Sequence, residues 1–303
     1  MKVTIVGGGG GAGASAAFNL LLLEGDFDVV LTDVREEMVT SHVMDLEQVL
    51  ELGGTGTIRS GDSSDVADSD IVVVTAAAPL TVNTSRLVYL FDNAEIVAGV
   101  ADQLAAAGEW EGVLLLVTNP VDPLCTLLQR RSGIERRRVL GYTLNDSLRL
   151  RTGIATELGA ESGSVEAWVI GEHGDTCVPL FGDARRDSEP LELTAEERVG
   201  AETFLRTWYR RHVALDSGRS STWTTGLGVA RMVSAIWGDS GELWPASVVL
   251  TGEYGVDGVA LSVPVTLGRA GVREIHEWPL SEGERARLQR SADAVREALD
   301  RIE

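Results

Sequence analysis

A histidine in the segment Gly-Glu-His-Gly-Asp, residues 171–175, is the side chain of this sequence best suited to move a proton near neutral pH. Imidazole has an ordinary pKa of about 6.5, so His173 can act as both acid and base. The apolar run at residues 165–170 predicts a buried strand before it, and the flanking glycines allow a ligand to approach closely. Because a lone histidine is more often structural than catalytic, acid–base chemistry is indicated here only together with other features of the chain.

A glycine-rich turn near the amino terminus has the pattern of a dinucleotide-binding loop. Gly8, Gly10 and Gly13 fit GxGxxG, and Gly7, Gly10 and Gly13 fit the related GxxGxxG. Glycines let the backbone approach a pyrophosphate, whose charge then lies at the amino terminus of the following helix. A run of glycines alone is equally typical of a flexible loop. The apolar strand predicted at residues 2–6, directly before the turn, favours the dinucleotide.

Asp33 completes this pattern because it ends a second apolar strand, residues 28–32, about 20 residues beyond Gly13. A carboxylate at this place can bind both ribose hydroxyls and would repel a 2′-phosphate. NAD is therefore the expected cofactor rather than NADP. Arg35 lies close enough in the sequence to weaken that preference.

The elements that must position these residues alternate between strands and helices in the first half of the chain. Continuous apolar runs at residues 71–74 and 113–117 are typical of parallel strands covered on both faces, and residues 87–107 predict a long helix. After about residue 143 the pattern changes. Residues 171–194 are irregular and polar, and the other predicted elements are helices at 146–158, 195–215, 223–237 and 281–302 and strands at 246–251 and 259–267.

A chain of 303 residues exceeds the usual size of a single core, so we expect two domains. The predicted fold is α/β: a Rossmann-type doubly wound parallel sheet followed by an α+β substrate domain. We place the dinucleotide-binding domain at residues 1–143 and the substrate and catalytic domain at residues 144–303.

The charge of the chain is strongly acidic. Asp and Glu number 46 against 26 Lys and Arg, giving a net charge of −20, and Lys2 is the only lysine. Such a surface repels nucleic acid and anionic membranes, so neither is an expected partner. We interpret the charge as adaptation to a salt-rich cytoplasm. The alternative is that the preference for arginine over lysine reflects base composition.

Three further features of the sequence indicate a cytoplasmic protein. No apolar run approaches the about 20 residues needed to span a bilayer. The first predicted strand begins at Lys2, which leaves no room for a signal peptide. Cys125 and Cys177 form no metal or redox motif, so we expect reduced thiols and no metal.

Several short motifs together resemble the malate and L-lactate dehydrogenase family, in particular its halophilic members, over essentially the whole chain. The resemblance implies an NAD-dependent oxidoreductase that interconverts an L-2-hydroxy acid and its 2-oxo acid by hydride transfer. It also implies a homo-oligomer, either a dimer or a tetramer. The motifs are Gly7 to Gly13 with Asp33, Thr75-Ala76-Ala77 leading to Arg86, Val117-Thr118-Asn119-Pro120, Asp146-Ser147-Leu148-Arg149, Gly171 to Asp175, Gly252-Glu253-Tyr254-Gly255 and Val263-Pro264-Val265.

The resemblance assigns roles to the acid–base residues. His173 would protonate the carbonyl oxygen as hydride arrives and remove that proton in reverse. Asp146 would hold the other ring nitrogen, and Arg149, three residues later on the same helix face, would bind the substrate carboxylate through two parallel hydrogen bonds. Taken alone, Asp146 could instead be a helix N-cap, and Arg149, with Arg151 near it, could belong to a solvated charged face.

The resemblance also assigns residues around the cofactor. Arg86 would lie on a mobile loop and polarise the substrate carbonyl when the loop closes. Asn119 would orient both substrate and nicotinamide, and Asn93 and Val117 would line the cofactor cleft. Taken alone, Arg86 could be an exposed arginine at a helix start, and Asn119 with Pro120 could form only a turn.

Leu80 is the residue that departs from the malate-specific pattern. It stands where malate enzymes place an arginine that pairs with the second carboxylate of the substrate. A carboxylate buried against Leu80 would be unpaired, at a cost of several kcal/mol. The sequence therefore predicts a monocarboxylic substrate. Malate dehydrogenase is the alternative within this class, and a catalytically silent NAD-binding sensor or scaffold is the alternative outside it.

The acidic charge generates a prediction about salt. We expect the melting temperature to rise between about 0.1 and about 2 M potassium chloride, because salt screens the repulsion among the acidic side chains. The Debye length falls from about 10 Å at 0.1 M to about 3 Å at 1 M. Thermal unfolding followed by circular dichroism measures this. A melting temperature that stays flat over the range would favour the base-composition explanation.

Overall fold

The computed structural model describes residues 1–79, 86–219 and 221–303, without the side chains of residues 86–88. The amino-terminal half forms parallel strands in the order β3-β2-β1-β4-β5-β6. This is the order of a Rossmann-type doubly wound sheet, as the sequence predicts. The strands are β1 (Lys2–Val6), β2 (Asp28–Thr32), β3 (Thr57–Ser60), β4 (Ile71–Val74), β5 (Val113–Leu116) and β6 (Val139–Tyr142).

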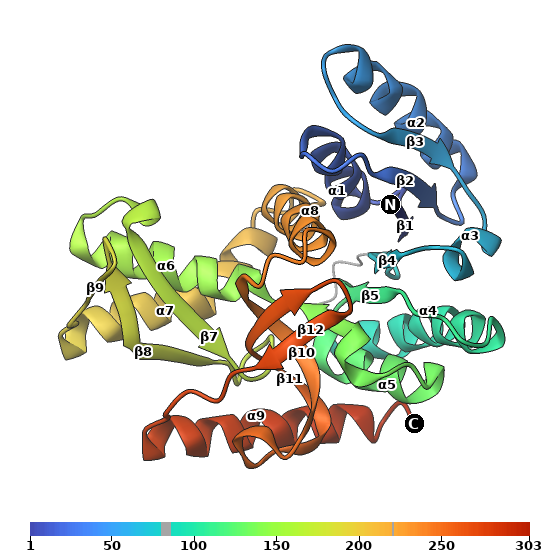
Figure 1. Cartoon of the computed structure of the whole chain (residues 1–303). Helices are drawn as coiled ribbons and strands as arrows, with labels where there is room; N and C mark the ends of the chain where they lie inside the picture. Colours follow the sequence, from blue (N-terminus) through green and yellow to red (C-terminus); the bar gives the residue numbers. More distant parts are fainter. Residues whose placement is uncertain (80–85, 220) are drawn as a thin grey trace.

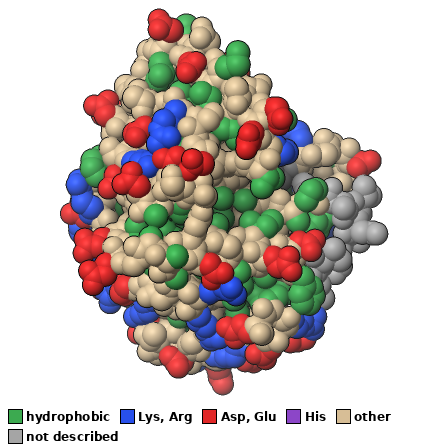
Figure 2. All heavy atoms as spheres, turned by 90° about the vertical axis from the view of Figure 1, so that its right-hand side faces the viewer, with side chains coloured by type: hydrophobic (Ala, Val, Ile, Leu, Met, Phe, Trp, Pro, Cys, Tyr) green, Lys and Arg blue, Asp and Glu red, His purple; other side chains and the backbone are tan. Residues whose placement is uncertain are grey.

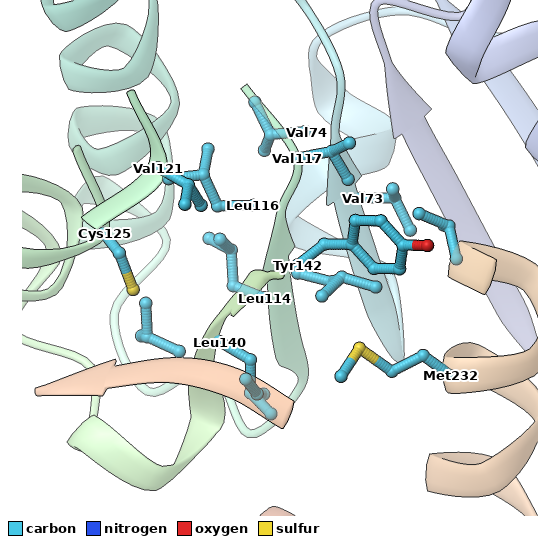
Figure 3. Packing of buried hydrophobic residues seen from close by; sticks show 14 of the residues in the cluster. Val73, Val74, Leu114, Leu116, Val117, Val121, Cys125, Leu140, Tyr142 and Met232 are labelled. Carbon is cyan, nitrogen blue, oxygen red and sulfur yellow. The ribbon is translucent and has the colours of Figure 1, made fainter. Parts of the chain in front are cut away.

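Helices cover both faces of this sheet, which is why its central strands are continuously apolar. One group of packed helices comprises α1 (Gly11–Leu22), α2 (Glu36–Glu51) and α8 (Trp223–Trp237). The other comprises α4 (Arg86–Ala106), α5 (Val121–Ser132) and α9 (Glu282–Leu299). Cys125 from α5 and Met232 from α8 approach the central strands from opposite sides (Figure 3). Shorter helical segments are α3 (Ser64–Ala67), η1 (Arg136–Arg138), η2 (Ser162–Ser164) and η3 (Glu253–Gly255).

The carboxy-terminal half extends the same sheet with antiparallel strands. β10 (Leu243–Thr251) pairs with β6, and β11 (Asp257–Gly268) and β12 (Gly271–Ile275) follow it. Among the described residues the sheet thus has nine strands and runs across the predicted boundary between residues 143 and 144. The boundary itself stays a prediction.

A second, smaller sheet lies at one end of the molecule, far from α2 (Figure 1). It contains β7 (Val165–Ile170), β8 (Val178–Arg186) and β9 (Glu189–Pro190), with α6 (Leu144–Leu158) and α7 (Ala195–Val213) beside it. The expectation of irregular structure at residues 171–194 is therefore wrong for β8. Its first residues are buried and its later ones mostly exposed, so the strand lacks the alternation that predicts a half-buried sheet.

The surface carries its acidic side chains in a mixed arrangement. On the face shown in Figure 2, Asp and Glu are interspersed with basic side chains. Exposed ion pairs of the protein include Arg131 with Asp102 and Arg273 with Asp239. Within the part of the chain that the structure describes, no helix is long and apolar enough to cross a membrane.

A helical glycine tests how closely α1 and α8 pack, and a second one on α4 serves as its control. A Cβ added at Gly226 on α8 would lie 2.1 Å from Ser15 Oγ on α1, whereas one added at Gly99 on α4 would meet nothing within 4 Å. We expect G226A to lower the free energy of unfolding by about 1–3 kcal/mol through overpacking. The matched control G99A should raise it by about 0.5–1 kcal/mol because alanine favours the helix. Urea unfolding of both variants measures the difference, and equal stabilities would contradict the packing.

Candidate active site

The glycine-rich loop joins β1 to α1 and lies against the segment that follows β4. Gly7 has φ of +92°, and a Cβ added there would lie 2.3 Å from the backbone nitrogen of Ala76. A Cβ at Gly13 would lie 2.6 Å from the carbonyl oxygen of Gly7. Side chains are therefore excluded from both positions, and the first N–H groups of α1 are left for an anion.

The other two predicted glycines fix the path of this loop. Gly8 donates its N–H to the carbonyl of Thr32 at 2.9 Å, which ties the loop to the end of β2. Gly10 donates to the carbonyl of Gly7 at 2.9 Å and stands directly before α1. All four predicted glycines thus lie together at the carboxyl ends of β1 and β2.

Asp33 directly follows β2 and lies beside the loop. Its carboxylate accepts hydrogen bonds from the backbone N–H of Gly9 at 3.1 Å and of Arg35 at 3.0 Å, and Arg35 Nε lies 3.2 Å away. Burial raises the pKa of Asp33, but these hydrogen bonds more than offset it, so the pKa lies below its ordinary value. The group is an ionised acceptor at neutral pH, which is the form that ribose hydroxyls require.

Asn93 links the loops that follow β4 and β5. Its side-chain oxygen accepts from the N–H of Ala78 and its amide nitrogen donates to the carbonyl of Asn119, both at 2.7 Å. Val117 lies at the end of β5, where its N–H donates to the carbonyl of Val74 at 2.8 Å. The structure therefore brings Asn93, Val117 and Asn119 together at the edge of the sheet where the glycine loop also lies.

His173 lies in the segment after β7 and faces Asp146 on α6. Its Nδ1 is 2.7 Å from Asp146 Oδ2. No described atom meets Nδ1 in hydrogen-bond geometry, and the contact is an ion pair only when the ring is protonated. Thr143 occupies the position before α6, so the alternative that Asp146 is the N-cap is wrong.

The second oxygen of Asp146 binds the arginine predicted beside it. Arg149 Nη1 donates to Asp146 Oδ1 at 2.9 Å, as the three-residue spacing on one helix predicts. The Arg149 side chain is only 15% exposed, which excludes the alternative of a solvated charged face. One buried carboxylate therefore lies between the imidazole and the guanidinium.

Trp208 on α7 is a neighbour of Arg149 that the sequence patterns do not indicate. The Arg149 guanidinium carbon lies 4.2 Å from the centroid of the Trp208 ring, within the range of a cation–π contact. The Trp208 ring also stacks on the ring of His212, with 5.0 Å between the two centroids. Helical spacing relates Trp208 to His212, but nothing local to α7 relates either residue to Arg149.

Asp122, the second residue of α5, is also missed by the sequence patterns. It is buried, and its carboxylate accepts from the backbone N–H of His173 and from the hydroxyl of Ser247, both at 2.6 Å. Burial raises the pKa of Asp122 to about 7. An aspartate inside an otherwise apolar helix segment is the one local signal that could have identified it.

Two predicted substrate residues are not placed by the structure. Leu80 lies outside the described residues, and Arg86 begins α4 with a side chain that is outside them too. Their roles stay predictions. Across residues 1–79, 86–219 and 221–303, no group of three or more His, Cys, Asp or Glu could hold a metal ion.

Comparison with known proteins covers the whole chain. The sequence model described as lactate/malate dehydrogenase, NAD binding domain, matches residues 1–141, and that described as lactate/malate dehydrogenase, alpha/beta C-terminal domain, matches residues 143–303. Malate dehydrogenase from Halobacterium salinarum is 35% identical over 99% of both chains. L-lactate dehydrogenase from Lactobacillus delbrueckii subsp. bulgaricus is 32% identical over 99% of both chains.

A solved structure of a malate dehydrogenase has the same fold as this chain. The malate dehydrogenase from Aeropyrum pernix superposes with a TM-score of 0.92 at 29% identity, covering 99% of this chain and 97% of that one. The predicted Rossmann-type α/β fold is confirmed. The chain, with its dinucleotide loop and its histidine–aspartate–arginine cluster, belongs to the lactate/malate dehydrogenase family of NAD-dependent oxidoreductases.

Proposed function

We propose that the protein is an NAD-dependent L-2-hydroxy acid dehydrogenase that acts on monocarboxylic substrates. The observation that carries this proposal is the Asp146 carboxylate, which contacts the ring of His173 with one oxygen and Arg149 with the other. A proton-transfer group and a carboxylate-binding group are thereby held side by side. These are the two functions that oxidation of a 2-hydroxy acid requires of the protein.

The residues of the first half of the chain fit NAD. The pyrophosphate would lie over Gly7 to Gly13 at the amino terminus of α1, and the ionised Asp33 would accept hydrogen bonds from the ribose hydroxyls. When bound, the nicotinamide accepts a hydride from the hydroxy acid or supplies one to the oxo acid. NAD is preferred to NADP because a 2′-phosphate would be repelled by Asp33, although Arg35 lies beside it.

His173 would carry the proton of the reaction. Among the described residues its Nε2 has no hydrogen-bond partner, so this atom is available to the substrate oxygen. In oxidation Nε2 takes the hydroxyl proton, and in reduction it returns a proton to the carbonyl oxygen. Asp146 stabilises the imidazolium formed in between, because its buried negative charge lies 2.7 Å from Nδ1.

Arg149 would bind the C1 carboxylate of the substrate. Within the described part of the chain, its one hydrogen-bond partner is Asp146, which leaves further N–H groups of the guanidinium for a bidentate pair. Trp208 covers one face of the guanidinium and restricts its rotation. Asn119 and Arg86 complete the proposal with the roles given above, orientation of the substrate and polarisation of its carbonyl.

Malate dehydrogenase is the second candidate function, because relatives at about one-third identity carry that name as well as L-lactate dehydrogenase. Leu80 supports the monocarboxylic substrate, since an apolar side chain there would leave a second carboxylate unpaired. A catalytically silent NAD-binding protein is disfavoured by the intact contacts among His173, Asp146 and Arg149. The homo-oligomer stays a prediction, which exposed apolar side chains on α1, α2 and α8 support: Phe18, Leu22, Met44 and Trp223.

Oxidation of NADH at high salt, with oxaloacetate, pyruvate and 2-oxoisocaproate compared side by side, tests the substrate. We expect the two monocarboxylic acids to give the higher kcat/KM. The control variant H173N should lose about 10²-fold or more in kcat, because proton transfer is removed, while binding NADH as tightly as the parent. A preference for oxaloacetate would reject the monocarboxylic proposal, and turnover by none of the three acids would reject the enzyme itself.

The stack of Trp208 on Arg149 gives a separate prediction. We expect W208L to raise KM for the preferred oxo acid by about 2–30-fold, the equivalent of a cation–π contact of about 0.5–2 kcal/mol. W208F, which keeps an aromatic face, should lose less, and the Kd for NADH should not change in either variant. Steady-state kinetics and NADH fluorescence titration measure both quantities. Equal KM values for the phenylalanine and leucine variants would contradict the stacking role.

A further inference from the structure

The buried carboxylate of Asp122 joins three parts of the fold that are distant in the sequence. One oxygen accepts the backbone N–H of His173, 51 residues away, and the other accepts the hydroxyl of Ser247 on β10, 125 residues away. Both distances are 2.6 Å. Asp122 itself is 1% exposed. None of the steps proposed above uses this residue.

A carboxyl in this position is costly to the fold. Burial opposes its ionised form and raises the pKa of Asp122 to about 7, although the hydrogen bonds from Ser247 and His173 and the charge of His173 act in the opposite direction. The negative charge of Glu172 acts in the same direction as burial and raises the pKa of Asp122 further. What the carboxyl contributes at this place is its two hydrogen bonds, to the N–H of His173 and to the hydroxyl of Ser247.

The segment that Asp122 holds is fixed in part by its own hydrogen bonds. Gly171, with φ of +88°, and Gly174 flank Glu172 and His173. Glu172 accepts the N–H of Gly174 on its carbonyl and the N–H of Thr176 on its carboxylate. The segment is anchored before the histidine by Gly171, which exchanges two backbone hydrogen bonds with Ser262. At the histidine itself, the backbone hydrogen bond described in the structure is the one to Asp122.

Asp122 also lies close to the residues that face the cofactor. Helix α5 begins directly after Asn119 and Pro120, and the carbonyl of Asn119 is fixed by Asn93. The hydrogen bond that the backbone N–H of His173 donates to Asp122, at the start of α5, therefore ties the position of His173 to that of Asn119. The contact of Asp146 with the ring orients the imidazole, but it does not tie the position of His173 to that of Asn119.

We propose that Asp122 is a positioning residue that holds the backbone of His173 by a hydrogen bond and so fixes the imidazole relative to the substrate and cofactor side of the site. The effect on turnover rests on the proposed function, whereas the anchoring of the segment does not. The carboxyl acts as an acceptor, and its charge is not required.

Replacing Asp122 with asparagine separates the role of its oxygen as a hydrogen-bond acceptor from the role of its negative charge. In D122N, the side-chain oxygen can still accept from the N–H of His173, and the amide can donate to the hydroxyl oxygen of Ser247, so both contacts survive without the charge. D122A and D122L both remove the acceptor. Leucine keeps the volume and avoids a cavity, which protects the experiment against a D122A chain that fails to fold.

Thr126 offers a matched control one turn later on the same helix. Its buried hydroxyl accepts the backbone N–H of Ala260 on β11 at 2.9 Å. T126V therefore removes this hydrogen bond, together with the one that the hydroxyl donates to the backbone carbonyl of Asp122 at 3.0 Å, while the Asp122 carboxyl and its contact with His173 stay in place. Any loss that follows from destabilising α5 in general should appear in this variant as well.

The experiment combines hydrogen–deuterium exchange of the peptide covering residues 171–177 with kcat, KM and the Kd for NADH, all on the full chain. We expect D122A and D122L to exchange faster in this peptide and to lose about 10–100-fold in kcat, as a displaced catalytic group does, with the Kd for NADH unchanged. D122N and T126V should stay within about threefold of the parent in kcat and keep its exchange rate.

Two outcomes would overturn the proposal. In the first, D122A and D122L lower the melting temperature as T126V does but leave exchange and kcat unaltered. In the second, D122N is as impaired as D122L, which would assign the effect to the charge. If the parent protein turns over none of the oxo acids, the proposed function fails, and the exchange measurement still decides whether Asp122 anchors the segment.

Discussion

The contact between the Asp146 carboxylate and the His173 ring is the interaction on which the candidate site depends. The same carboxylate also binds Arg149, so one side chain on α6 holds both the group proposed to transfer the proton and the group proposed to bind the substrate carboxylate. These side chains are largely buried, and water therefore screens their charges weakly. Loss of any one of the three would leave the others incompletely paired in a poorly solvated place, which is more costly than the loss of an exposed ion pair.

The continuous sheet explains why this cluster and the glycine loop lie at the same edge. The carboxyl ends of parallel strands lie at one edge of a sheet, and there the loops after β1, β2, β4 and β5 place the glycines, Asp33 and Asn119. Helix α6 starts after β6 at the same edge. The His173 segment arrives from the smaller sheet and joins β11 through the pair of hydrogen bonds between Gly171 and Ser262. The nine-stranded sheet and the smaller sheet thus meet next to the histidine.

Overall identity does not decide the specificity of the site. The chain has similar identity to a malate and to an L-lactate dehydrogenase, each over nearly the full length. Leu80 is the residue proposed above to distinguish the two activities, because apolar contacts discriminate weakly while an unpaired carboxylate is rejected strongly. Trp208 contacts the guanidinium of Arg149, the group proposed above to bind the carboxylate that both kinds of substrate share.

The sequence by itself determined the features that depend on neighbours in the chain. The strands at residues 2–6, 28–32, 71–74 and 165–170 and the helix at residues 223–237 were predicted at their observed bounds, because apolar patterning is local. The contact between Asp146 and Arg149 follows in the same way from their spacing on one helix turn. β8 was missed because its buried and exposed residues do not alternate, and Trp208 and Asp122 were missed because their partners are far away in the sequence. Only the tertiary structure decided those contacts, since the packing of α5, α7 and β10 around the histidine segment brings together residues that no local pattern relates.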